Sequence, residues 1–179
     1  MLPLSKTENN FWTFQPNITL HANFLIIEKL GVLIMGEPSI GKSELTLALL
    51  DRGYQMVCDD VVDITCKNNQ LIGRCPDVAY GYILISDIGM VNVPKLFGFD
   101  AVVAQYEISL IIKLIKCEKK LVTIDPLNPT FQEDMILGII IPKIIFPVYV
   151  GRNLPLLVET LIRNQMLKKE AFQKTRKIK

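Results

Sequence analysis

The chain has 179 residues, half of them hydrophobic, which is enough for one well-buried domain and too few for two of ordinary size. Its 20 Lys and Arg against 18 Asp and Glu give a formal net charge of +2, so no strong electrostatic field points to a nucleic acid or membrane partner. Four cysteines without a CxxC pair, and a single histidine, His21, disfavour a zinc site, a disulfide framework and a hydrolase triad.

Short apolar runs rich in Ile and Val, separated by Gly, Pro and Asp, predict a core made mainly of strands. In chain order, the predicted strands span residues 24–28, 31–35, 55–58, 61–65, 82–85, 109–115 and 144–149. The distribution of apolar residues predicts two helices, at 42–52, where Gly53 is a natural end, and at 154–168. We therefore expect a single α/β domain over residues 1–168, with a mixed β-sheet core and a few flanking helices.

The ends of the chain and its most apolar stretch give evidence on the cellular location of the protein. Residues 1–10 lack the apolar run and the small-residue cleavage site of a secretory signal. The window 135–151 is interrupted by a lysine and two prolines, and falls short of the roughly 18 uninterrupted apolar residues of a membrane span. We expect a cytoplasmic protein whose basic residues 169–179 form a mobile tail.

A phosphate-binding loop is predicted between the strand at 31–35 and the helix at 42–52. The sequence there satisfies the pattern G-x-x-x-x-G-K-S with Gly36, Glu37, Pro38, Ser39, Ile40, Gly41, Lys42 and Ser43. Backbone N–H groups of such a loop and of the helix N-terminus converge on nucleotide phosphates. Lys42 would neutralise the β- and γ-phosphates, and the Ser43 hydroxyl would ligate Mg²⁺. The competing interpretation is a glycine-rich turn capped by Ser39.

Two adjacent carboxylates, Asp59 and Asp60, end the predicted strand at 55–58. Successive side chains of a strand point to opposite faces, so one carboxylate can face the nucleotide as a base or metal helper while the other caps a turn. The alternative is that both only cap and solvate a tight connection. For His21, a partly buried imidazole at a strand edge is the default interpretation until other residues support catalysis.

Several motifs together resemble one known family. His21, the block 31–44 (GVLIMGEPSIGKSE), the pair Asp59 and Asp60, and the runs GMVNV, LFG and GRNL are similar in order and spacing to the catalytic domain of HPr kinase/phosphorylase, over about residues 14–167. The resemblance implies a P-loop kinase domain that forms hexamers in the cytoplasm. It also implies a phosphotransferase that uses ATP and Mg²⁺ to phosphorylate a serine of the phosphocarrier HPr, and that reverses the reaction with inorganic phosphate. The resemblance covers the family's catalytic domain and not its usual N-terminal domain, so we expect a short, single-domain form.

The resemblance also assigns roles to residues. Residues 36–43 would bind ATP, Ser43 would ligate Mg²⁺, and Asp60 would be the base that accepts the serine proton, while His21 and Lys42 match other active-site positions. Gly151 and Arg152 belong to the segment PVYVGR, which matches the family's dephosphorylation segment, with Arg152 as a phosphate-binding candidate.

Some positions depart from the family pattern on the reacting side. Leu84 and Ser86 stand where the family has an acidic Mg²⁺ ligand and an arginine, Pro126 replaces an active-site arginine, and Tyr149 replaces another arginine. Asp87 is the candidate replacement for the lost metal ligand.

These departures leave three hypotheses open. The first is a kinase of this family, with impaired activity. The second is a catalytically impaired nucleotide-binding regulatory protein of the same fold. The third is a small-molecule kinase of another P-loop family, which the matches at His21 and GRNL disfavour.

Overall fold

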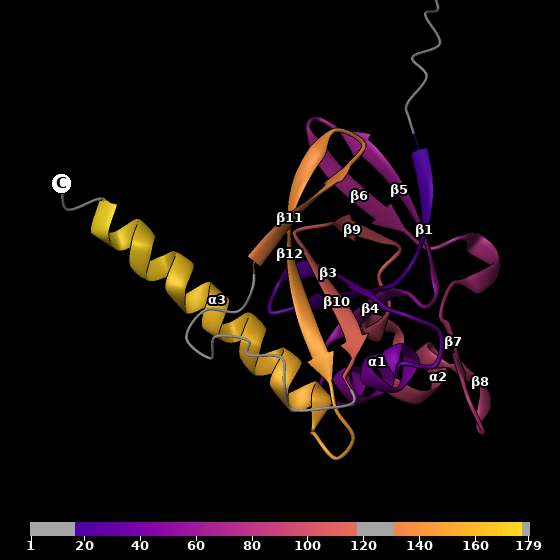
Figure 1. Ribbon diagram of the computed structural model, residues 1–179. Helices are drawn as coiled ribbons and strands as arrows, with labels where there is room; N and C mark the ends of the chain where they lie inside the picture. Colours follow the sequence, from indigo (N-terminus) through magenta and orange to yellow (C-terminus); the bar gives the residue numbers. More distant parts are fainter. Residues whose placement is uncertain (1–16, 118–130, 177–179) are drawn as a thin grey trace, which may run out of the picture.

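A six-stranded mixed sheet forms the centre of the computed structural model, which describes residues 17–117 and 131–176 (Figure 1). Its strands are β2 (Asn23–Ile27), β3 (Leu30–Met35), β4 (Gln55–Cys58), β10 (Leu110–Lys116), β11 (Phe131–Ile136) and β12 (Ile139–Val148). They lie in the order β11-β12-β10-β3-β2-β4, and β10 pairs in parallel with β3 on one side and β12 on the other. The carboxyl ends of these three strands therefore reach the same edge of the sheet.

Two smaller sheets accompany the central one. The first is antiparallel, with strands in the order β1 (Asn17–His21), β5 (Val61–Lys67), β6 (Gln70–Arg74) and β9 (Gln105–Glu107). The second is a hairpin of β7 (Tyr82–Ile85) and β8 (Gly89–Asn92). In Figure 1 this hairpin lies on the same side of the molecule as helix α1, away from the edge formed by β11 and β12.

The helices are α1 (Lys42–Asp51), α2 (Val93–Phe97) and α3 (Leu154–Arg176), with 3-10 turns at Asp77–Ala79 and Phe99–Ala101. Helix α1 follows the loop after β3 and stops at Gly53. This glycine has φ 86°, and its N–H donates to the carbonyl oxygen of Leu50 over 2.9 Å. Both features are typical of a C-terminal glycine. Helix α3 packs its first half near α1 and runs on beyond the sheet (Figure 1).

The two faces of the central sheet bury separate apolar clusters. Along β2, Leu25 and Ile27 face the helices, whereas Phe24 and Ile26 face the four-stranded sheet. This alternation follows from the two-residue period of a strand. Because both faces are covered, β2 and β3 are apolar throughout most of their length. The sheet is thus a middle layer, and its edges are where polar chemistry can reach solvent.

The central and the four-stranded sheet come very close where β3 begins. A Cβ atom on Gly31 would lie 1.9 Å from the backbone carbonyl oxygen of Glu107, at the end of β9. The carbonyl oxygen of Gly31 also accepts a hydrogen bond from the N–H of Ser109 over 2.8 Å. Only glycine fits at this position, because any side chain would collide with backbone rather than with a movable side chain.

The predicted fold class, α/β with a mixed sheet core and few helices, is confirmed. The strands at 55–58 and 82–85 match β4 and β7, and the helix at 42–52 matches α1 to within a residue. The prediction that a strand begins at 144 was wrong, because β12 starts at Ile139. Pro142, which lies within the strand, pairs with β11 alone, before the pairing with β10 begins at Lys143. A proline is tolerated where one side of the strand has no ladder to complete.

The last helix is longer than predicted, since α3 continues from 168 to Arg176. Its final residues lack an apolar stripe, but Lys, Glu, Ala and Gln favour helix without one. The domain boundary at 168 and the mobility of 169–179 stay predictions, and 177–179 lie outside the described residues. Among the helices at 17–117 and 131–176, none is both long and apolar enough to cross a membrane.

Candidate functional site

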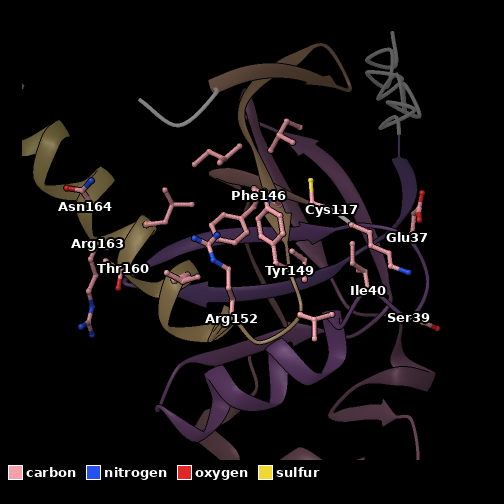
Figure 2. A pocket seen from close by; sticks show the side chains of 18 of the residues that line it. Glu37, Ser39, Ile40, Cys117, Phe146, Tyr149, Arg152, Thr160, Arg163 and Asn164 are labelled. Atoms are coloured by element: carbon pink, nitrogen blue, oxygen red, sulfur yellow. The ribbon is translucent and has the colours of Figure 1, made fainter. Parts of the chain in front are cut away.

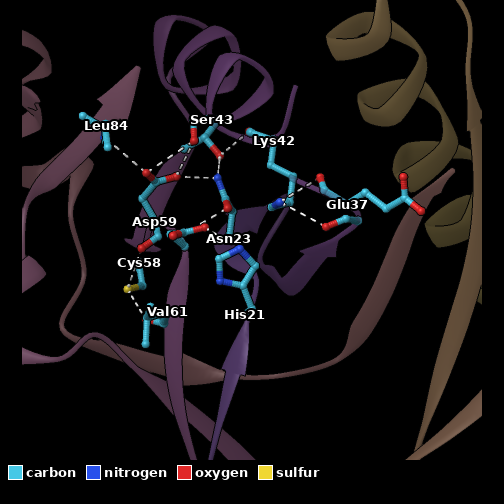
Figure 3. A network of polar contacts seen from close by, with 12 residues as sticks. His21, Asn23, Glu37, Lys42, Ser43, Cys58, Asp59, Val61 and Leu84 are labelled. Carbon is cyan, nitrogen blue, oxygen red and sulfur yellow. Dashed lines mark hydrogen bonds and ion pairs between the residues drawn. The ribbon is translucent and has the colours of Figure 1, made fainter. Parts of the chain in front are cut away.

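Two cavities flank the loop that joins β3 to α1. The larger one, of about 1550 Å³, lies between this loop, the end of β12 and α3 (Figure 2). The smaller one, of about 770 Å³, lies between the loop, the carboxylates that follow β4 and the turn at 84–89 (Figure 3). Pro38 and Ser39 line both cavities, so the loop is the wall between them. We call the smaller cavity the acidic cleft.

The loop has the backbone shape that a phosphate site needs. Gly41 has φ 99° and immediately precedes α1, whose first hydrogen bond runs from Leu45 N–H to the Gly41 carbonyl oxygen over 2.9 Å. Ser39 has φ 60°, in the left-handed region where glycine is unstrained. The loop therefore makes a left-handed turn at a serine, a conformation that strains a residue with a side chain.

Lys42 lies at the base of the loop, and only 6% of its surface is exposed. Its ammonium group donates to the carbonyl oxygens of Gly36 at 3.1 Å and Glu37 at 3.3 Å (Figure 3). An ammonium has three donors, so these two bonds hold the charge in place and leave one donor for another acceptor. A buried cation held in this way attracts an anion to the loop.

Ser43, at the start of α1, is joined to Asp59. The Ser43 hydroxyl donates to Asp59 Oδ1 over 3.1 Å, and the backbone N–H of Leu84 donates to Asp59 Oδ2 over 3.2 Å. Burial raises the pKa of Asp59, while the hydrogen bonds it accepts from Leu84 and Ser43 oppose that rise. The carboxylate is thus a desolvated group fixed next to the first hydroxyl of the helix.

Asn23 connects the two aspartates from the buried strand β2. Its side-chain amide donates to Asp59 Oδ1 and to Thr46 Oγ1, and its carbonyl oxygen accepts from the backbone N–H of Asp60 over 3.3 Å. Asn23 is fully buried, so all three contacts lie away from bulk water. An asparagine in this position fixes the spacing of Asp59 and Asp60 to each other and to α1.

His21 and Asp60 form the outer pair of the acidic cleft. His21 Nε2 lies 2.9 Å from Asp60 Oδ1, and both side chains are about half exposed, at 53% and 55%. Asp60 has φ 70°, a left-handed backbone conformation directly after Asp59. One carboxylate therefore faces Ser43 and the other faces His21 at the mouth of the cleft.

The β7–β8 turn forms the far wall of the cleft and carries Leu84 and Asp87. Leu84 is 63% exposed, so its side chain borders the cleft instead of packing into the core. Asp87 has φ 67° and is exposed on the same turn. The carboxylate of Asp87 thus shares the cavity with Ser43.

The structure separates the other predicted site residues from these. Arg152 lines the larger cavity, across the loop from Asp60, and its guanidinium lies 5.2 Å from the centre of the Tyr149 ring. Gly151, with φ 84°, provides the turn that leads to it. Pro126 lies outside the described residues.

The donor atoms of the acidic cleft suit a hard cation. Ser43 and Asp59, with Asp60 and Asp87 nearby, offer oxygen ligands alone, which magnesium prefers over softer metals. Among residues 17–117 and 131–176, no group of three His, Cys, Asp or Glu side chains forms a complete protein-only metal site.

Sequence reasoning missed Asn23 and left the role of Asp59 open. The signal for Asn23 was present, since a lone amide in the apolar run ANFLII is a buried polar residue that needs partners. Sequence spacing also gave no sign that Cys58 and Cys75 come together, with their sulfurs 2.8 Å apart as free thiols.

Known proteins share this architecture. The family described as HPr Serine kinase C-terminal domain matches residues 13–179. The HPr kinase/phosphorylase of Chromobacterium violaceum is 38% identical over 159 residues, which cover 88% of this chain and 50% of that protein. The HPr kinase/phosphorylase of Treponema pallidum is 34% identical over 161 residues, which cover 89% and 50%. The chain thus spans about half the length of these curated relatives.

A solved structure is more similar still. The HPr(Ser) kinase/phosphatase from Coxiella burnetii superposes with a TM-score of 0.83 at 61% sequence identity, covering 89% of this chain and 96% of that chain.

Proposed function

The chain belongs to the HPr serine kinase C-terminal domain family, and from this premise we propose that it is an ATP-dependent kinase that phosphorylates a serine of the phosphocarrier HPr. The observation that carries the proposal is the pairing of Asp59 with Ser43 and of Asp60 with His21, beside the phosphate loop. The family resemblance further leads us to propose reverse phosphorolysis, a cytoplasmic location and a homo-oligomer, specifically a hexamer.

In this proposal the loop at 36–43 binds the triphosphate of ATP. Loop amides and the N-terminus of α1 supply partial positive charge, and Lys42 adds a full one. Phosphoryl transfer requires mainly the positioning and neutralisation of phosphate oxygens, so a rigid cationic loop supplies much of what the reaction needs.

Ser43 and Asp59 would hold Mg²⁺, with Asp87 as a further ligand from the turn. When bound, the ion supplies neutralisation of the charge on the phosphate oxygens. Asn23 keeps the Asp59 carboxylate directed at Ser43. Because Asp59 is buried, its negative charge is poorly solvated and would be stabilised by a bound cation.

Asp60 would act as the general base. It accepts the proton of the substrate serine as the serine oxygen bonds to the γ-phosphorus and the bond to the leaving ADP oxygen breaks. His21 holds the carboxylate at 2.9 Å, and the half-exposed position lets a protein substrate reach it. In the proposed phosphorolysis, an oxygen of inorganic phosphate bonds to the phosphorus as the bond from phosphorus to the serine oxygen breaks, which gives pyrophosphate, and Asp60 returns the proton to the serine oxygen.

The phosphate-binding role expected for Gly151 and Arg152 stays a prediction. Arg152 lies on the other side of the loop from Asp60, next to the larger cavity. We therefore propose that Arg152 contributes to the reverse reaction from the side of the loop that faces the larger cavity, without contacting the reacting serine.

The experiment incubates the purified chain with labelled ATP, Mg²⁺ and HPr. We expect label on an HPr serine, and we expect Lys42→Ala to lose both ATP binding and transfer. Lys95→Ala, on the exposed face of α2, is the matched control and should leave both intact. Unchanged nucleotide affinity and rate in Lys42→Ala would remove the phosphate-loop assignment.

A second candidate function rests on Leu84. An exposed aliphatic side chain borders the cleft where the family pattern has an acidic metal ligand, and this favours weakened catalysis. A chain that binds ATP with Mg²⁺ but never labels HPr would be a nucleotide-binding regulatory protein of the same fold.

A further inference from the structure

The larger cavity, described above and shown in Figure 2, begins at the phosphate loop. Residues 37–40 form one wall, the end of β12 forms the floor, and the first half of α3 forms the opposite wall. Because the same loop borders the acidic cleft, a molecule whose phosphates lie on the loop can extend its remaining part into this cavity.

Sheet topology places the two cavities on opposite sides of β3. On one side β2 and β4 lead to Asp59 and Asp60, and on the other side β10 and β12 end at the larger cavity. Ligands of open α/β sheets bind outside the carboxyl ends of parallel strands, and β3, β10 and β12 are the parallel strands of this sheet. A bound nucleotide can therefore place its terminal phosphate on one side of the loop and its nucleoside part on the other.

The chemistry of the larger cavity suits a flat aromatic group. Phe146 and Tyr149 both line it, and the Arg152 guanidinium lies 5.2 Å from the centre of the Tyr149 ring (Figure 2). Thr160 and Asn164 add hydrogen-bonding groups from α3. Aromatic rings stack on nucleobases, and hydroxyl and amide groups can bind a sugar.

Ion pairs and a hydrogen bond hold the wall formed by α3 in place. Arg163 Nε lies 2.6 Å from Glu28 Oε1, and Arg52 Nε lies 3.3 Å from Glu159 Oε2. Tyr54 Oη also lies 3.0 Å from Glu159 Oε1. These contacts tie α3 to α1 and to the end of β2, so the cavity is formed without a ligand.

We infer that this cavity binds the nucleoside part of the nucleotide, with the base against Tyr149 and Phe146. The inference rests on the proposed function, because the phosphates must occupy the loop. It adds that one nucleotide spans both sides of the loop, with its base on the α3 side and its transferable phosphate on the Asp60 side.

The test compares ATP with inorganic tripolyphosphate, which has the phosphates and no nucleoside. In calorimetry with Mg²⁺, the wild type should bind ATP at least about tenfold more tightly, and Tyr149→Ala should remove most of this difference while leaving tripolyphosphate affinity unchanged. Tyr149→Phe should keep the preference for ATP. Tyr80→Ala, an exposed tyrosine that lines neither cavity, should behave as the wild type.

Equal affinity of the wild type for ATP and tripolyphosphate would overturn the inference, and so would an equal loss for both ligands in Tyr149→Ala. Photolabelling of the wild type with 8-azido-ATP needs no variant. Label within 144–167 supports the inference, and label on the β7–β8 hairpin overturns it. Failure of the proposed function looks different, because then ATP binding is absent or HPr stays unlabelled although ATP is bound.

Discussion

The side-chain amide of Asn23 donates a hydrogen bond to Asp59 Oδ1 over 2.5 Å. The same amide donates to Thr46, and the Asn23 carbonyl oxygen accepts from Asp60, so one buried residue joins α1 to both aspartates. We expect Asn23→Ala to lower the free energy of unfolding by about 1–3 kcal/mol, since it leaves buried polar groups without partners.

If Asn23 positions the carboxylates, the variant should also need more Mg²⁺ for half-maximal transfer, which a purely structural defect would not cause. Asn17→Ala, at the exposed start of β1, is the control. A normal Mg²⁺ requirement in Asn23→Ala would assign this residue to stability alone.

Asp59→Asn and Asp60→Asn should fail in different ways. Asp60→Asn is expected to keep ATP and Mg²⁺ affinity and to lower transfer by about 10²–10⁴, since the base is lost. Asparagine tolerates the left-handed φ of 70° at this position, so the fold is preserved. Asp59→Asn should weaken Mg²⁺ binding by about 10–100-fold, because the carboxylate next to Ser43 is gone. Calorimetry with Mg²⁺–ATP and a single-turnover transfer assay distinguish them, and identical defects in both measurements would refute the division of roles.

Metal binding should depend on pH through Asp59. Burial raises the pKa of this carboxyl, so it keeps its proton to a higher pH than an exposed aspartate does. Mg²⁺ must displace that proton, so the rise in Tm caused by Mg²⁺ should become smaller as the pH falls. This decrease should begin at a higher pH than the range in which exposed aspartates titrate. Thermal melts from pH 4 to pH 8, with Asp59→Asn as the control that lacks this titration, measure the effect.

Without metal, the effect of Asp59 on stability depends on pH in the opposite direction. The folded chain binds the Asp59 proton more tightly than the unfolded chain, so this group's contribution to the unfolding free energy increases as the pH falls through the interval between the ordinary and the raised pKa. The same contribution decreases as the pH rises through that interval. A Mg²⁺-induced change in Tm that is constant down to pH 4 would contradict both statements.

Leu84→Glu should strengthen metal binding. The residue is exposed, borders the cleft, and its N–H already contacts Asp59 Oδ2 at 3.2 Å, so a carboxylate there adds an oxygen ligand near Ser43. We expect Mg²⁺ affinity to increase by a factor on the order of ten. Met90→Glu is the matched control, because Met90 is the cross-strand partner of Leu84 and equally exposed, but does not line the cleft. Equal gains in both variants would show a general charge effect.

Local sequence patterns predicted the parts of the site that are formed by residues adjacent in the sequence. The loop at 36–43 lies between its strand and helix as expected, and Asp59 and Asp60 have different partners, Ser43 for the first and His21 for the second. The period of a strand is not the cause, because both aspartates follow the end of β4 and Asp60 has φ 70°. What sequence could not give is the partner across the sheet. Asn23 acquires its role because β2 pairs with β4, which brings it to Asp59, 36 positions away in the sequence.

The same limit explains the position of Arg152. Sequence placed it in a segment linked to phosphate chemistry, but the order of strands decides which side of the loop it faces. Short strands such as β1 and β9 were also missed, since their few, largely polar residues carry little periodicity of their own and are ordered by their neighbours.

The close packing at Gly31 limits which substitutions this chain can tolerate. β3 carries the phosphate loop at its far end, and its near end is wedged against the backbone of Glu107 with no space for a methyl group. A mutation to alanine there would push the strand along or out of its layer and shift the loop at 36–43, although the altered residue lies outside that loop. The position of the loop at 36–43 is thus set partly at the seam between two sheets.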